Sequence, residues 1–303
     1  MSPRFYVGRR PTRSSRVVRN LKTIFRVELL EDRLTPSSLY VDNPADFIIT
    51  TDQGAPGLDA GDTVTFNPSG GTQTSHSGLV YGTNAFGTIQ SAVDAATAGD
   101  IINVAQGTFS EAVTVNKTLT LQGNQFGVDA RQAGRTGAAA TETVVNGNAG
   151  VTPFNVTASN VVLNGFTVSG NTSAALYGYG VRVAPGTSGT HVLDNIVQDN
   201  IAGIAPANTD PNNPTLIQGN LIRNNNQPGP VTGVGIYSDQ STAGGPLTGV
   251  VIFDNTITGE VNGILLGSTD AAAPSSNVTI SSNILDANSS NALLAFNLRF
   301  RQF

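Results

Sequence analysis

The chain has 303 residues, enough for one large domain or two small ones, and only 12% of them are charged. It contains no Cys, which excludes disulfides, thiolate metal sites and a cysteine nucleophile. Two His leave little material for a His-rich metal site or a Ser-His relay. No run of 18 apolar residues occurs, so no transmembrane helix is expected. The 34 Gly and many Asn favour an all-β chain with frequent turns.

Charge is spread unevenly along the chain. Residues 1–36 carry nine basic and three acidic side chains, whereas residues 37–303 carry seven basic and eighteen acidic ones. An acidic body repels phosphate backbones, so no nucleic acid partner is expected. We interpret residues 1–38 as a basic, disordered leader, which lacks the apolar core of a secretory signal. The alternative is a leader that binds nucleic acid.

A short motif lies near the end of this leader. The sequence Leu-Glu-Asp-Arg-Leu-Thr-Pro occupies residues 30–36. It resembles the N-terminal "LE-x-R-x-x-P" signature of secreted and surface proteins of planctomycete-type bacteria. The resemblance implies export, and we therefore expect an extracellular or cell-surface location.

Residues 39–87 are predicted to form a segment of short strands. Residues 39–41, 46–51 and 63–66 have the composition of strands, and Gly, Pro and Ser loops join them. We expect this segment to pack over the domain that follows.

The hydrophobic period changes from helix to strand within residues 86–123. Ile89, Ala92, Val93 and Ala96 form the apolar stripe of a short helix, with Thr88 at its start and Gly99 at its end. Apolar residues then alternate at 102 and 104, at 113 and 115, and at 119 and 121. These are predicted as three strands, separated by turns at residues 106–108 and 116–117. A helix followed by three short strands is typical of a cap and the first coil of a β-solenoid.

One pattern then recurs at intervals of 25 to 42 residues: apolar-x-x-Asn-x-apolar-x-x-Asn, followed by Gly-apolar. Its first Asn falls at Asn195, Asn220, Asn255 and Asn283, and an earlier copy has Phe166 in this position. Constant cores with insertions of varying length are typical of a solenoid. Asn tolerates the left-handed backbone of a tight bend, so the row is predicted to stack as a structural ladder of amides.

The cap and these repeats resemble the right-handed parallel β-helix of the pectin-lyase-like superfamily. The resemblance implies an all-β solenoid over residues 88–303 with a short N-terminal capping helix. Members include polysaccharide lyases, polygalacturonases, epimerases, phage tailspikes and surface proteins. The enzymes among them work in a groove along the strand that follows the Gly-apolar step.

Side chains that carry catalysis are not evident in that groove. Arg182, Ala205, Tyr237 and Leu265 are predicted to point outward, whereas a pectate-type lyase needs carboxylates for calcium beside an arginine. Asp194 and Asp254 share one position, but two coil spacings put them about 10 Å apart as turn residues. The tripeptide at 208–210 matches only the first part of the polygalacturonase signature. We therefore predict no catalytic residue.

A binding site is the stronger expectation. Tyr177, Tyr179, Arg182 and Tyr237 are predicted to gather on one face of adjacent coils, where aromatic rings and a guanidinium suit a sugar or uronate. The alternative is an ordinary amphipathic surface. Asp42 and Asp46 are a weak calcium signal, so no metal or cofactor is predicted.

The sequence thus predicts a non-catalytic extracellular or cell-surface β-helix that is structural or binds a polysaccharide or cell-envelope component. The alternative is a polysaccharide lyase or glycoside hydrolase of the same superfamily, with acids supplied by loops, such as Asp210, Asp239 and Asp270. Near the C-terminus, apolar residues alternate at 294, 296, 298 and 300 without a polar cap. This pattern favours a truncated β-helix over a self-capping strand or a strand that pairs with another copy. It predicts no particular oligomer.

Overall fold

The computed structural model describes residues 35–147, 151–172, 178–208, 210–268, 274–296 and 298–299. Residues 36–303 form one compact unit. The leader up to residue 34, together with Tyr177, Asp270 and Phe300, lies outside the described residues.

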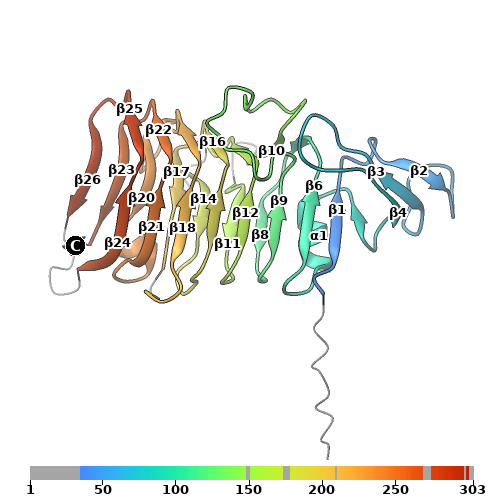
Figure 1. Ribbon diagram of the computed structural model, residues 1–303, viewed down its shortest axis with the longest axis horizontal. Coiled ribbons are helices and arrows are strands. Elements are labelled where there is room, and N and C mark those ends of the chain that lie inside the picture. The colour runs from blue at the N-terminus through green and yellow to red at the C-terminus, as the bar shows by residue number, and fades with distance from the viewer. Residues whose placement is uncertain are drawn as a thin grey trace, which may run out of the picture. The chain divides into compact units, whose positions relative to one another are not determined.

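The body is a parallel β-helix, as predicted. Each coil contributes one strand to each of three parallel sheets, named here A, C and D, and the chain visits them in the order A, C, D from coil to coil (Figure 1). Sheet A consists of β1 (Ser38–Val41), β5 (Ala85–Phe86), β6 (Ile101–Val104), β9 (Thr120–Gln122), β12 (Val162–Asn164), β15 (His191–Leu193), β18 (Thr215–Gln218), β21 (Thr248–Phe253), β24 (Ser275–Ser281) and β27 (Leu298–Arg299).

The other two parallel sheets have seven strands each. Sheet C consists of β7 (Gly107–Phe109), β10 (Thr143–Asn146), β13 (Phe166–Ser169), β16 (Ile196–Gln198), β19 (Leu221–Arg223), β22 (Thr256–Thr258) and β25 (Ile284–Asp286). Sheet D consists of β8 (Val113–Val115), β11 (Phe154–Val156), β14 (Tyr179–Val183), β17 (Ala202–Ala205), β20 (Val234–Ser238), β23 (Asn262–Gly267) and β26 (Asn291–Phe296).

A short helix, α1 (Ile89–Ala95), packs against β8 at the start of the solenoid. Thr88 caps its N-terminus as predicted, because its side chain accepts from the backbone of Ser91. The predicted end at Gly99 is wrong, since the helix is capped at Ala96. The ammonium group of Lys117 donates to three backbone carbonyls at this end, at 2.7 to 3.0 Å, and so satisfies carbonyls that the helix leaves unpaired.

The segment before α1 contributes to two sheets. β2 (Ile48–Thr51), β3 (Thr63–Phe66) and β4 (His76–Val80) form an antiparallel sheet of their own. β1 instead joins sheet A, where it pairs with both β5 and β6. Its Tyr40 ring stacks on His76, the first residue of β4, with ring centroids 4.7 Å apart.

The turn predicted at residues 106–108 is also wrong. Gly107 to Phe109 form β7, which pairs in parallel with β10. Only Phe109 of this strand faces the core, so the segment lacks the alternation of apolar residues that marks a strand in the sequence.

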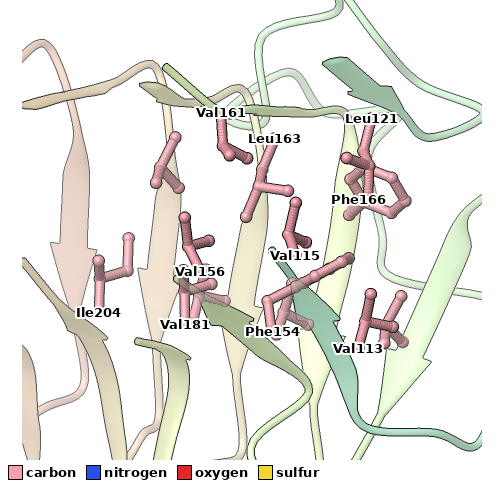
Figure 2. Packing of buried hydrophobic residues seen from close by; sticks show 14 of the residues in the cluster. Val113, Val115, Leu121, Phe154, Val156, Val161, Leu163, Phe166, Val181 and Ile204 are labelled. Carbon is pink, nitrogen blue, oxygen red and sulfur yellow. The ribbon is translucent and has the colours of Figure 1, made fainter. Parts of the chain in front are cut away.

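Inward side chains stack from coil to coil and fill the solenoid (Figure 2). On sheet D, Val113, Phe154, Val181 and Ile204 occupy equivalent positions of successive strands. Phe166, in the position of the recurring Asn, is fully buried, and its ring packs edge-on against Phe154 at 5.2 Å. It therefore fills the core where the amide row begins.

The four asparagines of the predicted row form a continuous ladder at the corner between sheets A and C. The backbone and side-chain N–H groups of Asn195 donate to Oδ1 of Asn220, at 2.9 and 3.2 Å. Asn220 donates in the same way to Asn255, and Asn255 to Asn283. The left-handed backbone of the bend was predicted at the asparagine, and this is wrong. It lies at the residue before each rung, where φ is positive: Asp194, Gly219, Asp254 and Ser282.

A second ladder runs along the corner between sheets C and D. Its rungs come from the second Asn of the repeat: Asn171, Asn200, Asn225, Glu260 and Asn288. Each backbone N–H donates to the side-chain oxygen of the next rung, so both corners carry the same kind of bond. One rung is a carboxyl group instead of an amide.

The last described coil is the most exposed part of the solenoid. β25 and β26 are the terminal strands of sheets C and D, and β27 pairs with the edge of β24. Large apolar side chains on these strands are 38 to 56% exposed: Ile284, Leu293, Leu294 and Phe296.

The first ladder predicts that the same substitution costs more stability at a buried rung than at the exposed end. Asn220→Ala would leave the buried donors of Asn195 without an acceptor, at a cost of about 3 kcal/mol in the free energy of unfolding. Asn283→Ala removes the same groups at the partly exposed end, where water replaces them, so its cost should stay below about 1 kcal/mol. Chemical denaturation followed by circular dichroism measures both, and equal losses would contradict the ladder as a buried unit.

Candidate functional site

A pocket of about 380 Å³ lies on the outer face of sheet D. It is formed by residues of β20 and β23 and by the segment 229–232 that precedes β20. The lining is Gly229, Pro230, Val231, Thr232, Val234, Tyr237, Asn262 and Leu265. This lining has no charged side chain, and its volume lies in the range that small-molecule sites occupy.

Tyr237 offers the aromatic surface of the pocket. It is half-buried, and its ring stacks on that of Tyr179 with centroids 6.2 Å apart and planes 21° from parallel. Tyr179 is only 1% exposed and packs with Ala202 and Ala205. Of the predicted aromatic cluster, Tyr179 therefore supports the ring of Tyr237 and does not present its own.

The hydroxyl of Tyr237 is fixed by Asp239. It donates to Oδ2 of Asp239 at 2.8 Å, while Oδ1 caps α2 (Gln240–Ala243) by accepting from the backbone of Thr242 at 2.6 Å. Burial alone would raise the pKa of Asp239, but these hydrogen bonds hold the pKa below its ordinary value. Asp239 is thus an ionised structural acceptor, poorly suited to act as a general acid.

Arg182 lies farther along the same face. It pairs in register with Ala205, and Tyr237 pairs with Leu265, so the outward row has the predicted order. Two coil spacings separate Arg182 from Tyr237, about 10 Å. The guanidinium donates to Oδ1 of Asn155 at 2.9 Å. The structure thus places Arg182 on the same face as the pocket but outside its lining.

Carboxylates gather instead at the corner between sheets A and C. The connection between β9 and β10, residues 123–142, crosses this corner and is called here the strap segment. Its Arg131 binds Asp129 at 2.5 Å and Asp254 at 2.6 Å. Burial, with the nearby charge of Asp129, raises the pKa of Asp194. Asp194 and Asp254 have the predicted turn backbones, but no sequence pattern predicts their neighbour Arg131, which is 123 residues from Asp254.

A second ion pair of the strap segment is fully buried. The guanidinium of Arg135 binds Glu142 at 2.8 and 2.9 Å, and both side chains are at most 1% exposed. Arg135 also donates to the backbone carbonyls of Val128 and Asp194. These contacts tie the strap segment to the coil of β15 and β16.

The two weaker sequence signals have structural roles. Oδ1 of Asn208 accepts from the backbone of Asp210, and its amide nitrogen donates to two backbone carbonyls, which orders a loop. Asp42 is fully buried, and burial, with the charge of Asp46, raises the pKa of Asp42 to about 7 although it accepts from Asn43.

The histidines lie on different sheets. His76 is on β4 beside β1, whereas His191 is on β15, four strands from β1 in sheet A and hence about 19 Å away. Within the described residues, no three His, Asp or Glu side chains are placed to hold one metal ion.

Comparison with known proteins gives one family. Residues 111–297, more than half of the chain, match the family described as "Periplasmic copper-binding protein (NosD)". No curated protein and no solved structure matches the chain. In the part of the chain that the structure describes, neither helix is long and apolar enough to cross a membrane.

The two ion pairs of the strap segment should differ in strength. Arg135→Met leaves the carboxylate of Glu142 buried without its partner and should cost about 3 to 5 kcal/mol of unfolding free energy. Arg131→Met breaks contacts between side chains that are 24 to 38% exposed and should cost about 1 kcal/mol or less, and less still at high salt. Denaturation at low and high ionic strength measures both variants, and a larger loss for Arg131→Met would contradict this assignment.

Proposed function

The chain belongs to the NosD family, and we propose that this member is an exported, non-catalytic β-helix that binds a neutral saccharide on the outer face of sheet D. The proposal rests on the pocket beside Tyr237. The word "periplasmic" in the family description, and the resemblance of the leader to exported proteins, support export.

The pocket suits an uncharged sugar for physical reasons. A pyranose has apolar faces and polar edges, and the half-buried ring of Tyr237 supplies a flat apolar partner for such a face. Asn262 and Thr232 add polar side chains to the lining. The Thr232 hydroxyl is bonded to the backbone of Gly229, and Oδ1 of Asn262 accepts from Asn291, so the amide nitrogen of Asn262 is the donor that we assign to a sugar hydroxyl.

The ring of Tyr179 stacks on that of Tyr237, and Asp239 accepts a hydrogen bond from the Tyr237 hydroxyl. Because Tyr237 is already held in place, little side-chain entropy is lost when a ligand binds.

The enzymatic alternative has less support. A hydrolase needs two carboxyl groups that face a substrate, and a lyase of the pectate type needs carboxylates for calcium. Among the described residues, Asp239 caps α2, Asp210 accepts from Asn212 within its own loop, and Asp129 and Asp254 bind Arg131 at another corner. These acids are held by other groups of the protein, and none of them is among the residues that line the pocket.

Copper, which the family description names, does not fit the residues of this chain. Copper sites in proteins use imidazole, thiolate and thioether ligands. The sequence has no Cys, its one Met is Met1, and its two histidines lie about 19 Å apart. Each histidine could therefore give only a one-imidazole contact, so we derive no function through copper.

Tyr237 provides the test of saccharide binding. Tyr237→Ala should lower the affinity for a bound neutral oligosaccharide about tenfold, because the stacked ring contributes on the order of 1.4 kcal/mol. Tyr237→Phe keeps the ring and should retain most of the affinity. Isothermal titration with cello-, xylo- and chito-oligosaccharides, and with oligogalacturonates as the charged comparison, measures these effects.

Arg182→Ala is the matched control on the same face, since it lies outside the pocket lining. It should leave the binding of neutral sugars unchanged. Tight binding of oligogalacturonates that disappears in Arg182→Ala would move the site from the pocket to the arginine. Release of unsaturated uronates by the wild type would favour a lyase and contradict the proposal.

Metal analysis after dialysis against Cu²⁺ tests the mismatch with the family description. Less than one tightly held ion per chain is expected, with no difference between the wild type and His191→Ala. A stoichiometric ion that is lost in His191→Ala or His76→Ala would show a copper site that this donor set does not suggest.

A further inference from the structure

Glu260 is the one carboxyl rung of the second ladder, whose other rungs are the amides of Asn171, Asn200, Asn225 and Asn288. Its Oε1 accepts from the backbone and the side chain of Asn225, at 3.1 and 2.9 Å. Its backbone N–H donates to Oδ1 of Asn288 at 3.1 Å. The carboxyl group thus continues the ladder through one oxygen.

The other oxygen of Glu260, Oε2, corresponds to the amide nitrogen of the asparagine rungs, which is a hydrogen-bond donor. In the neighbouring rungs, the amide nitrogens of Asn225 and Asn288 donate to the backbone carbonyls of Val197 and Ile257. Glu260 is 2% exposed, and its Oε2 is buried with no hydrogen-bond partner among the described residues. A carboxylate cannot donate there, whereas a carboxylic acid carries one O–H and so replaces an amide group.

This rung joins the two walls of the pocket beside Tyr237. Asn225 leads into residues 226–233, which carry Val231 and Thr232 of one wall, and Glu260 precedes Asn262 of the other wall by two residues. The backbone N–H of Asn262 donates to the carbonyl of Gly233 at 2.7 Å. Breaking the bond between Asn225 and Glu260 would therefore loosen both walls.

We propose that Glu260 is a positioning residue that holds the pocket in shape only in its protonated, uncharged form. The binding role of the pocket rests on the proposed function, but the shape of the pocket does not. Ionisation would place an unpaired negative charge in the ladder, and such a charge is expensive to bury. The corner would then open to admit water.

The surroundings of Glu260 favour the uncharged form. Burial raises the pKa of Glu260 to about 7, against the hydrogen bonds from Asn225, which lower the pKa. Asp199, which follows β16, adds a negative charge that also raises the pKa. The residues next to Glu260 on the neighbouring coils are uncharged: Asn225, Asn288 and Gly235. Gly235 lies close to the side chain, since a Cβ atom at this position would be 3.4 Å from Cγ of Glu260.

The sign of the pH dependence follows from a folded pKa above the ordinary value of 4.5. Below pH 4.5 the group is neutral in both the folded and the unfolded chain, and its full contribution to stability is present. Between pH 4.5 and about 7 the unfolded chain loses the proton first, so stability falls as pH rises. At pH 8 only about one Glu260 in ten keeps its proton.

Hydrogen exchange of the whole chain, measured without ligand at pH 5.5 and pH 8 and corrected for intrinsic rates, tests the proposal. In the wild type, peptides from residues 226–235 and 260–266 should exchange roughly 25-fold faster at pH 8, the change in the opening equilibrium for a pKa of 4.5 in the open state and about 7 in the closed state. Glu260→Gln restores an amide to the ladder, so these peptides should be equally protected at both pH values. Because no sugar is present, the result stands whether or not the pocket binds a saccharide.

Asp42→Asn is the matched control, since Asp42 is a second buried carboxyl whose pKa is raised to about 7 and which lies before α1. It should leave the pH dependence of residues 226–235 unchanged. Equal corrected exchange at the two pH values in the wild type, or the same pH dependence in Glu260→Gln, would overturn the proposal. If a saccharide binds, its affinity should fall from pH 5.5 to pH 8 in the wild type and stay constant in Glu260→Gln.

Discussion

The hydrogen bond between side chains at the same corner of successive coils is the interaction on which the rest of the structure depends. A parallel stack buries the backbone at every bend, where a coil would otherwise leave polar groups without partners. An asparagine at the bend accepts through Oδ1 from the coil before it and donates through Nδ2 toward the coils on both sides. Each rung satisfies the hydrogen-bonding groups of the rungs next to it, so the coils stack without water between them. The same bonds align successive coils and thereby fix the register of all three sheets.

This constraint determines where the chain is free to vary. The bends between sheets A and C keep two residues in the later coils, a positive-φ residue and an asparagine, because an insertion there would break the ladder. Variation is found in the links from sheet D to sheet A and in residues 224–233. It is also found in the strap segment, which is the bend between sheets A and C of an early coil, before the ladder begins. Loops held on a rigid frame are where binding sites usually occur, and the pocket beside Tyr237, which we propose as such a site, is lined in part by one of these segments. The strap segment shows the other outcome, since its two arginines use the extra length to fasten coils together.

The amino-acid pattern was sufficient to predict the features that recur along the chain. It was insufficient to predict contacts that occur only once. The ladder asparagines, the helical cap and the outward row recur or follow a period, so one chain contains several copies of the signal. Arg131 has no such signal, because its partner Asp254 is 123 residues away and reaches it only after the coils stack. The strand at Gly107 was missed because one buried residue shows no alternation. Tyr179 could not be distinguished from an exposed tyrosine, since its burial depends on the loops and rings that cover it in the fold.

The same reasoning explains how the chain can belong to a family named for copper while lacking a suitable donor set. The matched residues, 111–297, contain both ladders and the coils between them, but only one of the two histidines and no methionine. The features that recur over this length are apolar residues and asparagines, which fold the solenoid and do not favour copper as ligands. A match that depends on such residues shows a shared fold. The function of a protein with this fold depends on the few side chains that face outward. In this chain the side chains that we propose for that role are Tyr237 and its neighbours on sheet D, whose pocket lining carries no charge.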